Sequence, residues 1–231
     1  EEGNETQQPV VTPVEGVAIV EALALTPTTA PLFYSPATPD ETMRALAEQQ
    51  AGALHIRSVY DEDGVDTAVP DISTVANASI TPAAARPARF LRLVKPVSIP
   101  DRDLVDLRGT AFGRSSGELM REIIGYAPIH PDGSVYVQVP ANVPFAISIT
   151  DGAGRRISAR HRNWLQVRPG EVLTCHGCHT SESTAPHGRL DAQPPSINVG
   201  GPFAGLADTF EFVGGDTIAE AHARVAGPPA P

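Results

Sequence analysis

Short apolar runs separated by turn residues fill the middle of the chain. Two of these runs, 54–60 and 135–139, alternate between apolar and polar positions, which is the period of a strand with one buried face. The turns Pro131-Asp132-Gly133 and Asp151-Gly152 lie between runs, and Gly133 can take a positive φ. Short strands with a turn about every 8–12 residues predict a mainly β fold, an antiparallel β-sandwich. The six runs are 54–60, 89–94, 122–126, 135–139, 145–150 and 155–158.

Two helices are predicted outside these runs, over residues 40–50 and 217–225. Weaker strand patterns lie at 17–20 and 208–213. We therefore divide the chain into three parts, with long irregular arms at both ends. They are an N-terminal arm or linker (1–50), a β-sandwich domain with the candidate site (51–200) and a C-terminal tail (201–231) whose last residues, 227–231, are expected to fray.

Composition narrows the class of protein. The 231 residues include 23 prolines, about twice the usual ~5% share, which favours loops and short strands over a helical bundle. The formal net charge is −10, so nucleic acid and anionic membrane surfaces are not expected partners. The chain contains no apolar run of the roughly 20 residues needed to span a bilayer, so we expect no membrane-spanning segment.

The strongest chemical signal is the motif Cys175-His176-Gly177-Cys178-His179. Two cysteines separated by two residues and followed by histidine match the attachment pattern of a c-type haem. Each thiol would form a thioether with the porphyrin, and the histidine would bind the iron. One helical turn would set both cysteines along one haem edge. We predict one covalent haem c, held by Cys175 and Cys178, with His179 as the proximal iron ligand.

Two other readings of the motif stay open. Cys175 and Cys178 are the only cysteines, and they could form a redox disulfide or half of a zinc site. A zinc site needs one more ligand from the remaining histidines or carboxylates. A thioredoxin-like site needs a strand before the motif and a long helix after it, whereas 180–186 is a poor helix sequence. The direct match to the attachment pattern favours haem.

The second axial ligand of the iron is not specified by the motif. His187 follows His179 by eight residues, which span at most about 28 Å and can reach around a macrocycle edge. His161 arrives from the segment before the motif and is the alternative metal ligand. Met43, Met120 and an open position are further possibilities. Trp164, the only tryptophan, is close enough in sequence to pack on the haem or on the sandwich rim.

Several segments of the chain share the pattern of one known family. They are 56–61, 86–90, 124–134, 139–141, 144–145, Asp151 with 154–156, 168–171, 175–179 and 187–189. They resemble the middle domain of the hydrazine synthase alpha subunit, and within it the related proteins of bacteria with no evident hydrazine chemistry. The resemblance covers roughly residues 50–200 and implies an immunoglobulin-like β module that ends in a c-type haem site. It does not imply hydrazine synthesis, because 231 residues leave no room for that enzyme's propeller domain or a second haem motif.

These observations predict a c-type cytochrome domain that carries one haem for electron transfer, an electron carrier rather than an enzyme. The alternatives are a subunit or fragment of a hydrazine-synthase-like oxidoreductase with an open catalytic haem, and a β-sandwich interaction module with a structural haem. Haem is attached to this motif outside the cytoplasm, so we expect an exported protein, periplasmic or extracellular, whose signal was cleaved or that was cut from a longer precursor. Its expected partners are other redox or haem-bearing subunits, or copies of itself.

Overall fold

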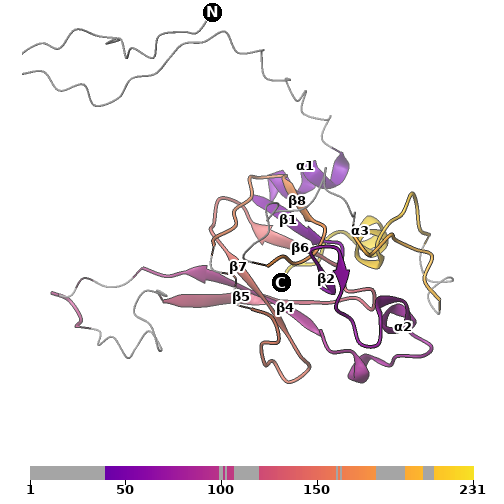
Figure 1. Ribbon diagram of the computed structural model, residues 1–231. Coiled ribbons are helices and arrows are strands. Elements are labelled where there is room, and N and C mark those ends of the chain that lie inside the picture. Colours follow the sequence, from indigo (N-terminus) through magenta and orange to yellow (C-terminus); the bar gives the residue numbers. More distant parts are fainter. Residues whose placement is uncertain are drawn as a thin grey trace, which may run out of the picture. The chain divides into compact units, whose positions relative to one another are not determined.

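The computed structural model describes a large part of the chain, all of it within the unit Thr38–Pro231 (Figure 1). The described residues are 40–98, 101, 103–106, 120–159, 161, 163–180, 196–204 and 211–231. The predicted strand 17–20, the first half of the predicted strand 208–213, and His187 lie outside them. The second half of that strand, 211–213, has no regular structure.

The described part of the chain is mainly β, as predicted, with three sheets and few helices. No helix there is long and apolar enough to cross a membrane. The strands are β1 (Ala51–Ile56), β2 (Asp61–Glu62), β3 (Val65–Asp66), β4 (Phe90–Pro96), β5 (Arg121–Pro128), β6 (Val135–Pro140), β7 (Ala146–Thr150) and β8 (Val172–Cys175). The α-helices are α1 (Glu41–Glu48), α2 (Ile72–Ala76) and α3 (Ile218–Ala226), and Ala83–Ala85 form a 3-10 turn.

The first three-stranded sheet has the order β6-β1-β8. β1 pairs with β6 in antiparallel register, with Leu54 opposite Val137. β8 pairs with β1 in parallel, with Cys175 opposite Ile56, and the two strands lie side by side in Figure 1. The prediction of purely antiparallel pairing is therefore wrong for β8, because this strand returns from a distant part of the sequence rather than from a hairpin.

The second three-stranded sheet has the order β5-β4-β7 and is antiparallel throughout. β5 and β6 follow one another across the turn at Gly133, whose φ is +79° as predicted, but they belong to different sheets. The predicted strand 155–158 is not a full strand. It follows the edge of β7 through a hydrogen bond from the Ile157 amide to the Ile149 carbonyl oxygen, another from the Ile149 amide to the Ser158 hydroxyl oxygen, and an isolated bridge.

The main hydrophobic core takes side chains from both three-stranded sheets. Leu54 and Val137 from the first sheet join Leu91 and Leu93 from the second, and all four are fully buried. β1 is buried on both faces, because Leu46 of α1 covers its alanines on the other side. The strand predicted at 54–60 instead runs from Ala51 to Ile56, and its second face carries Ala51, Ala53 and the buried His55.

Both predicted terminal helices are present, and side chains cap them. Asp40 caps α1 by accepting a hydrogen bond from the Met43 amide. Thr217 and Glu220 form a reciprocal capping box at the start of α3. The residues after α3 do not fray as predicted, since the Pro229 carbonyl oxygen accepts a 2.9 Å hydrogen bond from the Gln138 amide of β6.

One buried carboxylate joins the turn before β6 to α3. Asp132 is fully buried, and its Oδ1 accepts hydrogen bonds from the amide and hydroxyl of Ser134. Its Oδ2 accepts from the Asn198 side chain at 2.8 Å and from the Ile218 amide at 3.0 Å. The carboxylate therefore satisfies one of the free amides at the helix N-terminus and fixes α3 on the domain.

Candidate functional site

The CxxCH motif begins at the end of an edge strand. Cys175 is the last residue of β8, and its carbonyl oxygen accepts a hydrogen bond from the Arg57 amide. The following residues form an irregular loop instead of the expected helical turn. The loop is held as a partial strand beside β2, where Cys178 bridges Glu62. The Cys178 amide and carbonyl oxygen therefore form hydrogen bonds with the hairpin, so they are not available for the hydrogen bonds of a helical turn.

Asp61 fixes the far side of this loop. Its carbonyl oxygen accepts a 2.7 Å hydrogen bond from the Cys178 amide. Its carboxylate, which is fully buried, accepts from the Gly64 amide at 2.7 Å and the Ile197 amide at 2.9 Å. One residue thus connects the motif, the β2–β3 hairpin and the segment 196–198.

Further hydrogen bonds hold the residues around Cys178. The Asp63 amide donates to the Cys178 carbonyl oxygen, and the Asp63 carboxylate accepts from the Thr180 amide at 2.8 Å. Ser196 donates its hydroxyl to the His176 carbonyl oxygen at 2.9 Å. The backbone of the motif is therefore supported by two segments that are distant in sequence.

The two thiols are half-buried against the main hydrophobic core and are not joined by a disulfide. Burial raises the pKa of Cys175 to about 11. Burial raises the pKa of Cys178 to about 12, and the charges of Glu62 and Asp61 add to this effect. Both thiols are therefore protonated at neutral pH.

The protonated state of the thiols helps to distinguish the three interpretations of the motif, which are haem attachment, a zinc site and a redox disulfide. Zinc binding and disulfide exchange use the thiolate, and redox CxxC pairs have lowered pKa values. β8 does supply the strand that a thioredoxin-like site requires, but the raised pKa values oppose such reactivity. No cluster of three or more metal-ligating side chains occurs within the described ranges. A thioether carries no charge, so apolar surroundings suit it.

His179 has the hydrogen bond expected of an iron ligand. Its Nδ1 lies 2.9 Å from the Thr180 carbonyl oxygen, which can only accept, so Nδ1 carries the proton. Nε2 is then the nitrogen with a free lone pair, which is the form that binds a metal. Together with the uncharged thiols, this arrangement fits covalent haem attachment. The haem and its ligands remain predictions.

The structure shows the contacts of two other predicted site residues, His161 and Trp164. His161 Nδ1 bonds the Asn163 carbonyl oxygen at 2.7 Å. Trp164 lies under the Arg121 guanidinium, 4.8 Å from its ring centre, at the start of β5 in the second sheet. The predicted packing of Trp164 on a haem or on the sandwich rim stays a prediction. His187 lies outside the described residues, so the second axial ligand also stays a prediction.

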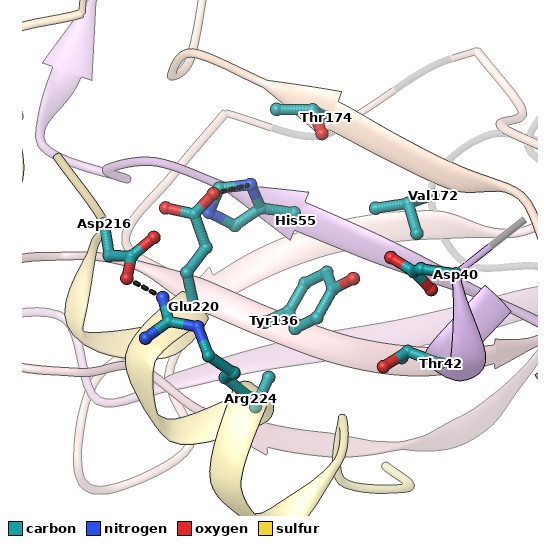
Figure 2. Close-up of a pocket in the computed structure, with 10 residues that line it drawn as sticks. Asp40, Thr42, His55, Tyr136, Val172, Thr174, Asp216, Glu220 and Arg224 are labelled. Atoms are coloured by element: carbon teal, nitrogen blue, oxygen red, sulfur yellow. Dashed lines mark ion pairs between the residues drawn. The ribbon is translucent and has the colours of Figure 1, made fainter. Parts of the chain in front are cut away.

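Sequence reasoning missed a buried histidine on β1, which lines an open pocket of about 240 Å³ (Figure 2). His55 is almost fully buried, with Nε2 3.2 Å from the Thr217 hydroxyl and Nδ1 3.6 Å from the Glu220 carboxylate. Tyr136 packs edge-on against the imidazole at 5.4 Å. Arg224 pairs with Asp216 at the rim of the pocket.

Thr217, His55 and Glu220 resemble the nucleophile, base and acid of a catalytic triad. The geometry of this cluster nevertheless excludes acyl transfer. Thr217 is fully buried, and its hydroxyl accepts the Glu220 amide as the cap of α3. No substrate can therefore reach that oxygen. Burial raises the pKa of Tyr136 to about 12, so the phenol stays neutral. The cluster holds α3 on β1, and the capping box was its only sequence signal.

Two buried histidines, His55 and His130, should make the folded domain less stable in acid. Burial lowers the pKa of His55 and of His130 below the ordinary 6.5, although the nearby Glu220 and Asp132 carboxylates oppose the shifts. Unfolding restores the ordinary values, so below pH 6.5 the unfolded chain binds more protons than the folded one. We expect the urea midpoint to fall between pH 7 and about pH 5, and His130→Gln to reduce that fall. Equal midpoints across this range for the unmodified chain would contradict the assignment.

The geometry defines a class of protein before any comparison: a mainly β domain with a CxxCH motif at the end of an edge strand. The family model described as the hydrazine synthase alpha subunit middle domain matches residues 94–180. Over this segment, the resemblance indicated by the sequence is confirmed. The match ends just after the CxxCH motif and includes all of it.

The chain was also compared with solved structures and with curated proteins. The solved structure of Kuenenia stuttgartiensis hydrazine synthase is similar at 19% sequence identity with a TM-score of 0.40. The similarity covers 56% of this chain and 17% of that chain, so this chain spans less than one fifth of the hydrazine synthase chain it matches. No curated protein matches the sequence.

Proposed function

We propose that this chain is a c-type cytochrome domain with one covalent haem, an immunoglobulin-like β-sandwich that transfers electrons and does not itself catalyse a reaction. The observation that carries the proposal is the CxxCH motif, which lies inside the family-matched segment 94–180 and whose thiols are half-buried and uncharged. When bound, the haem supplies a one-electron iron couple.

Each residue of the motif has a distinct task in this proposal. Cys175 and Cys178 tether the cofactor from the end of β8, against apolar side chains that exclude water. His179 binds the iron through Nε2, because its Nδ1 proton is committed to the Thr180 carbonyl oxygen. His187, or alternatively His161, completes the ligand set. Trp164 is proposed to border the cofactor.

The proposed cellular location and partners of this chain follow from the proposed haem. Haem attachment to CxxCH occurs outside the cytoplasm, so we propose export to the periplasm or beyond. A single haem passes an electron only to a neighbouring cofactor. We therefore propose that the chain works beside other haem-bearing or redox subunits or copies of itself, which agrees with the word subunit in the family description.

The family match favours one second candidate, a subunit or fragment of a hydrazine-synthase-like oxidoreductase whose iron keeps an open position. The two candidates differ in the sixth ligand. A histidine there blocks small molecules, whereas an open position lets them bind and react.

An absorption spectrum of the chain, produced with a haem attachment system, separates these candidates. We expect a c-type spectrum in the oxidised and dithionite-reduced states that carbon monoxide leaves unchanged, and a covalent haem by mass. His187→Ala, compared with His161→Ala as the matched control, should make the reduced iron bind carbon monoxide. A shift in the unmodified chain would favour the catalytic candidate.

Loss of the attachment residues provides the complementary test. The variant Cys175→Ala/Cys178→Ala should carry no covalent haem by mass, while its far-ultraviolet circular dichroism stays that of a folded β domain. Absence of haem from the unmodified chain under the same conditions would overturn the proposed function.

A further inference from the structure

An acidic surface with apolar residues lies directly beside the motif. It is formed by the β2–β3 hairpin and the loop into α2, and we call it the acidic hairpin surface. The hairpin is bonded to the motif through the Asp61, Asp63 and Cys178 backbone hydrogen bonds described above. The surface comprises Glu62, Asp63, Val65, Asp66, Val69 and Asp71.

Charge of one sign accumulates on this segment. Between Arg57 and Arg86 the sequence contains five carboxylates and no lysine or arginine. Within the hairpin, Glu62 pairs directly with Val65, so these two side chains lie on the same face. These carboxylates lie beside the site of haem attachment, because the Asp61 carbonyl oxygen accepts the Cys178 amide and the Asp63 amide donates to the Cys178 carbonyl oxygen.

Two valines on this surface are exposed to solvent. Val65 is 63% exposed and Val69 is 80% exposed. The Asp66 carboxylate holds the loop that carries Val69, because its two oxygens accept hydrogen bonds from the Ala68 amide at 2.9 Å and the Ile72 amide at 2.8 Å. Val65 lies on the same face of the hairpin as Glu62, and Val69 lies on the loop that Asp66 holds, so apolar and carboxylate side chains occur together on this surface, as in a partner surface with a polar rim.

We infer that the acidic hairpin surface docks a redox protein partner that presents lysine and arginine side chains around an apolar centre. This inference rests on the proposed function, because the haem motif beside the surface is what makes docking useful. Opposite charges raise the rate of encounter and orient the partner, and the effect weakens as salt screens it. Docking here brings the partner's cofactor to the edge of the domain where Cys178 lies.

A binding experiment tests the surface without requiring haem. A fluorescent octalysine peptide is titrated with the full chain, with Glu62→Lys and with Glu41→Lys, a control that makes the same charge change at an exposed position on α1. We expect Glu62→Lys to weaken binding about fivefold or more at low salt and Glu41→Lys to change it less than about twofold. Equal weakening by both variants, or no peptide binding to the unmodified chain, would overturn the inference.

A kinetic experiment tests the surface in the haem-loaded chain. Electron transfer to hexaamminecobalt(III), a small cation, should slow in Glu62→Lys and not in Glu41→Lys, and transfer to anionic ferricyanide should not slow in either. Indifference of the cobalt reaction to Glu62→Lys would contradict docking at this surface. If the chain carries no haem, the proposed function fails, and the peptide titration alone decides whether the surface binds basic partners.

Discussion

Replacing Asp132 with alanine should lower the free energy of unfolding by about 3–4 kcal/mol, the largest effect we expect from any single polar residue. The substitution removes the acceptor of the Ser134, Asn198 and Ile218 hydrogen bonds and leaves their donors buried. No water can replace the carboxylate easily, because the side chain is fully buried. Urea unfolding followed by far-ultraviolet circular dichroism measures the change.

Asp151→Ala is the matched control for this prediction. Asp151 also accepts backbone amides of its own turn, from Ala153 and Arg155, but its side chain is partly exposed and water can replace it. We therefore expect a much smaller loss of stability from Asp151→Ala than from Asp132→Ala. Similar losses for the two variants would show that the Asp132 network does not hold α3 on the domain.

The strands were predictable because their hydrophobic pattern is local, whereas their pairing is not. The runs at 89–94, 122–126, 135–139 and 145–150 all correspond to strands β4 to β7. Nothing in the turn at Gly133 indicates that β5 and β6 enter different sheets. β8 was missed because it has only four residues, Val172–Cys175, and is half-buried along its length. Its parallel partner β1 lies more than a hundred residues earlier.

The candidate site likewise has a local part that the sequence predicts and a long-range part that it does not. The CxxCH motif is contiguous, so its chemistry could be read from the sequence, while the bonds from Asp61 and Ser196 that support it depend on the folded chain. The His55 cluster joins residues 162 positions apart. A lone histidine in an apolar strand gives no sign of such a partner, and a capping box such as that of Thr217 and Glu220 indicates a helix start, not a contact with a strand.

Gly177 illustrates a requirement that the motif alone conceals. In CxxCH the two middle positions carry no chemistry, so any residue would serve. In the folded chain a Cβ at position 177 would lie 2.5 Å from the Asp61 Cβ and carbonyl oxygen. Relief of that clash must move the backbone, because neither atom belongs to the far end of a flexible side chain. The same carbonyl oxygen accepts the Cys178 amide, so the motif would move with it.

Gly177→Ala should therefore destabilise the domain by about 2–3 kcal/mol, from overpacking and the weakened Cys178 hydrogen bond, and should lower the fraction of chains with covalent haem. Urea unfolding and intact mass measure the two effects. Gly152→Ala is the control, since its Cβ would meet only Arg89 atoms at 3.7 Å or more, an ordinary contact. We expect it to change stability by less than about 0.5 kcal/mol. If Gly177→Ala behaved like Gly152→Ala, the close approach of the motif to Asp61, and with it the support we assign to the haem site, would be wrong.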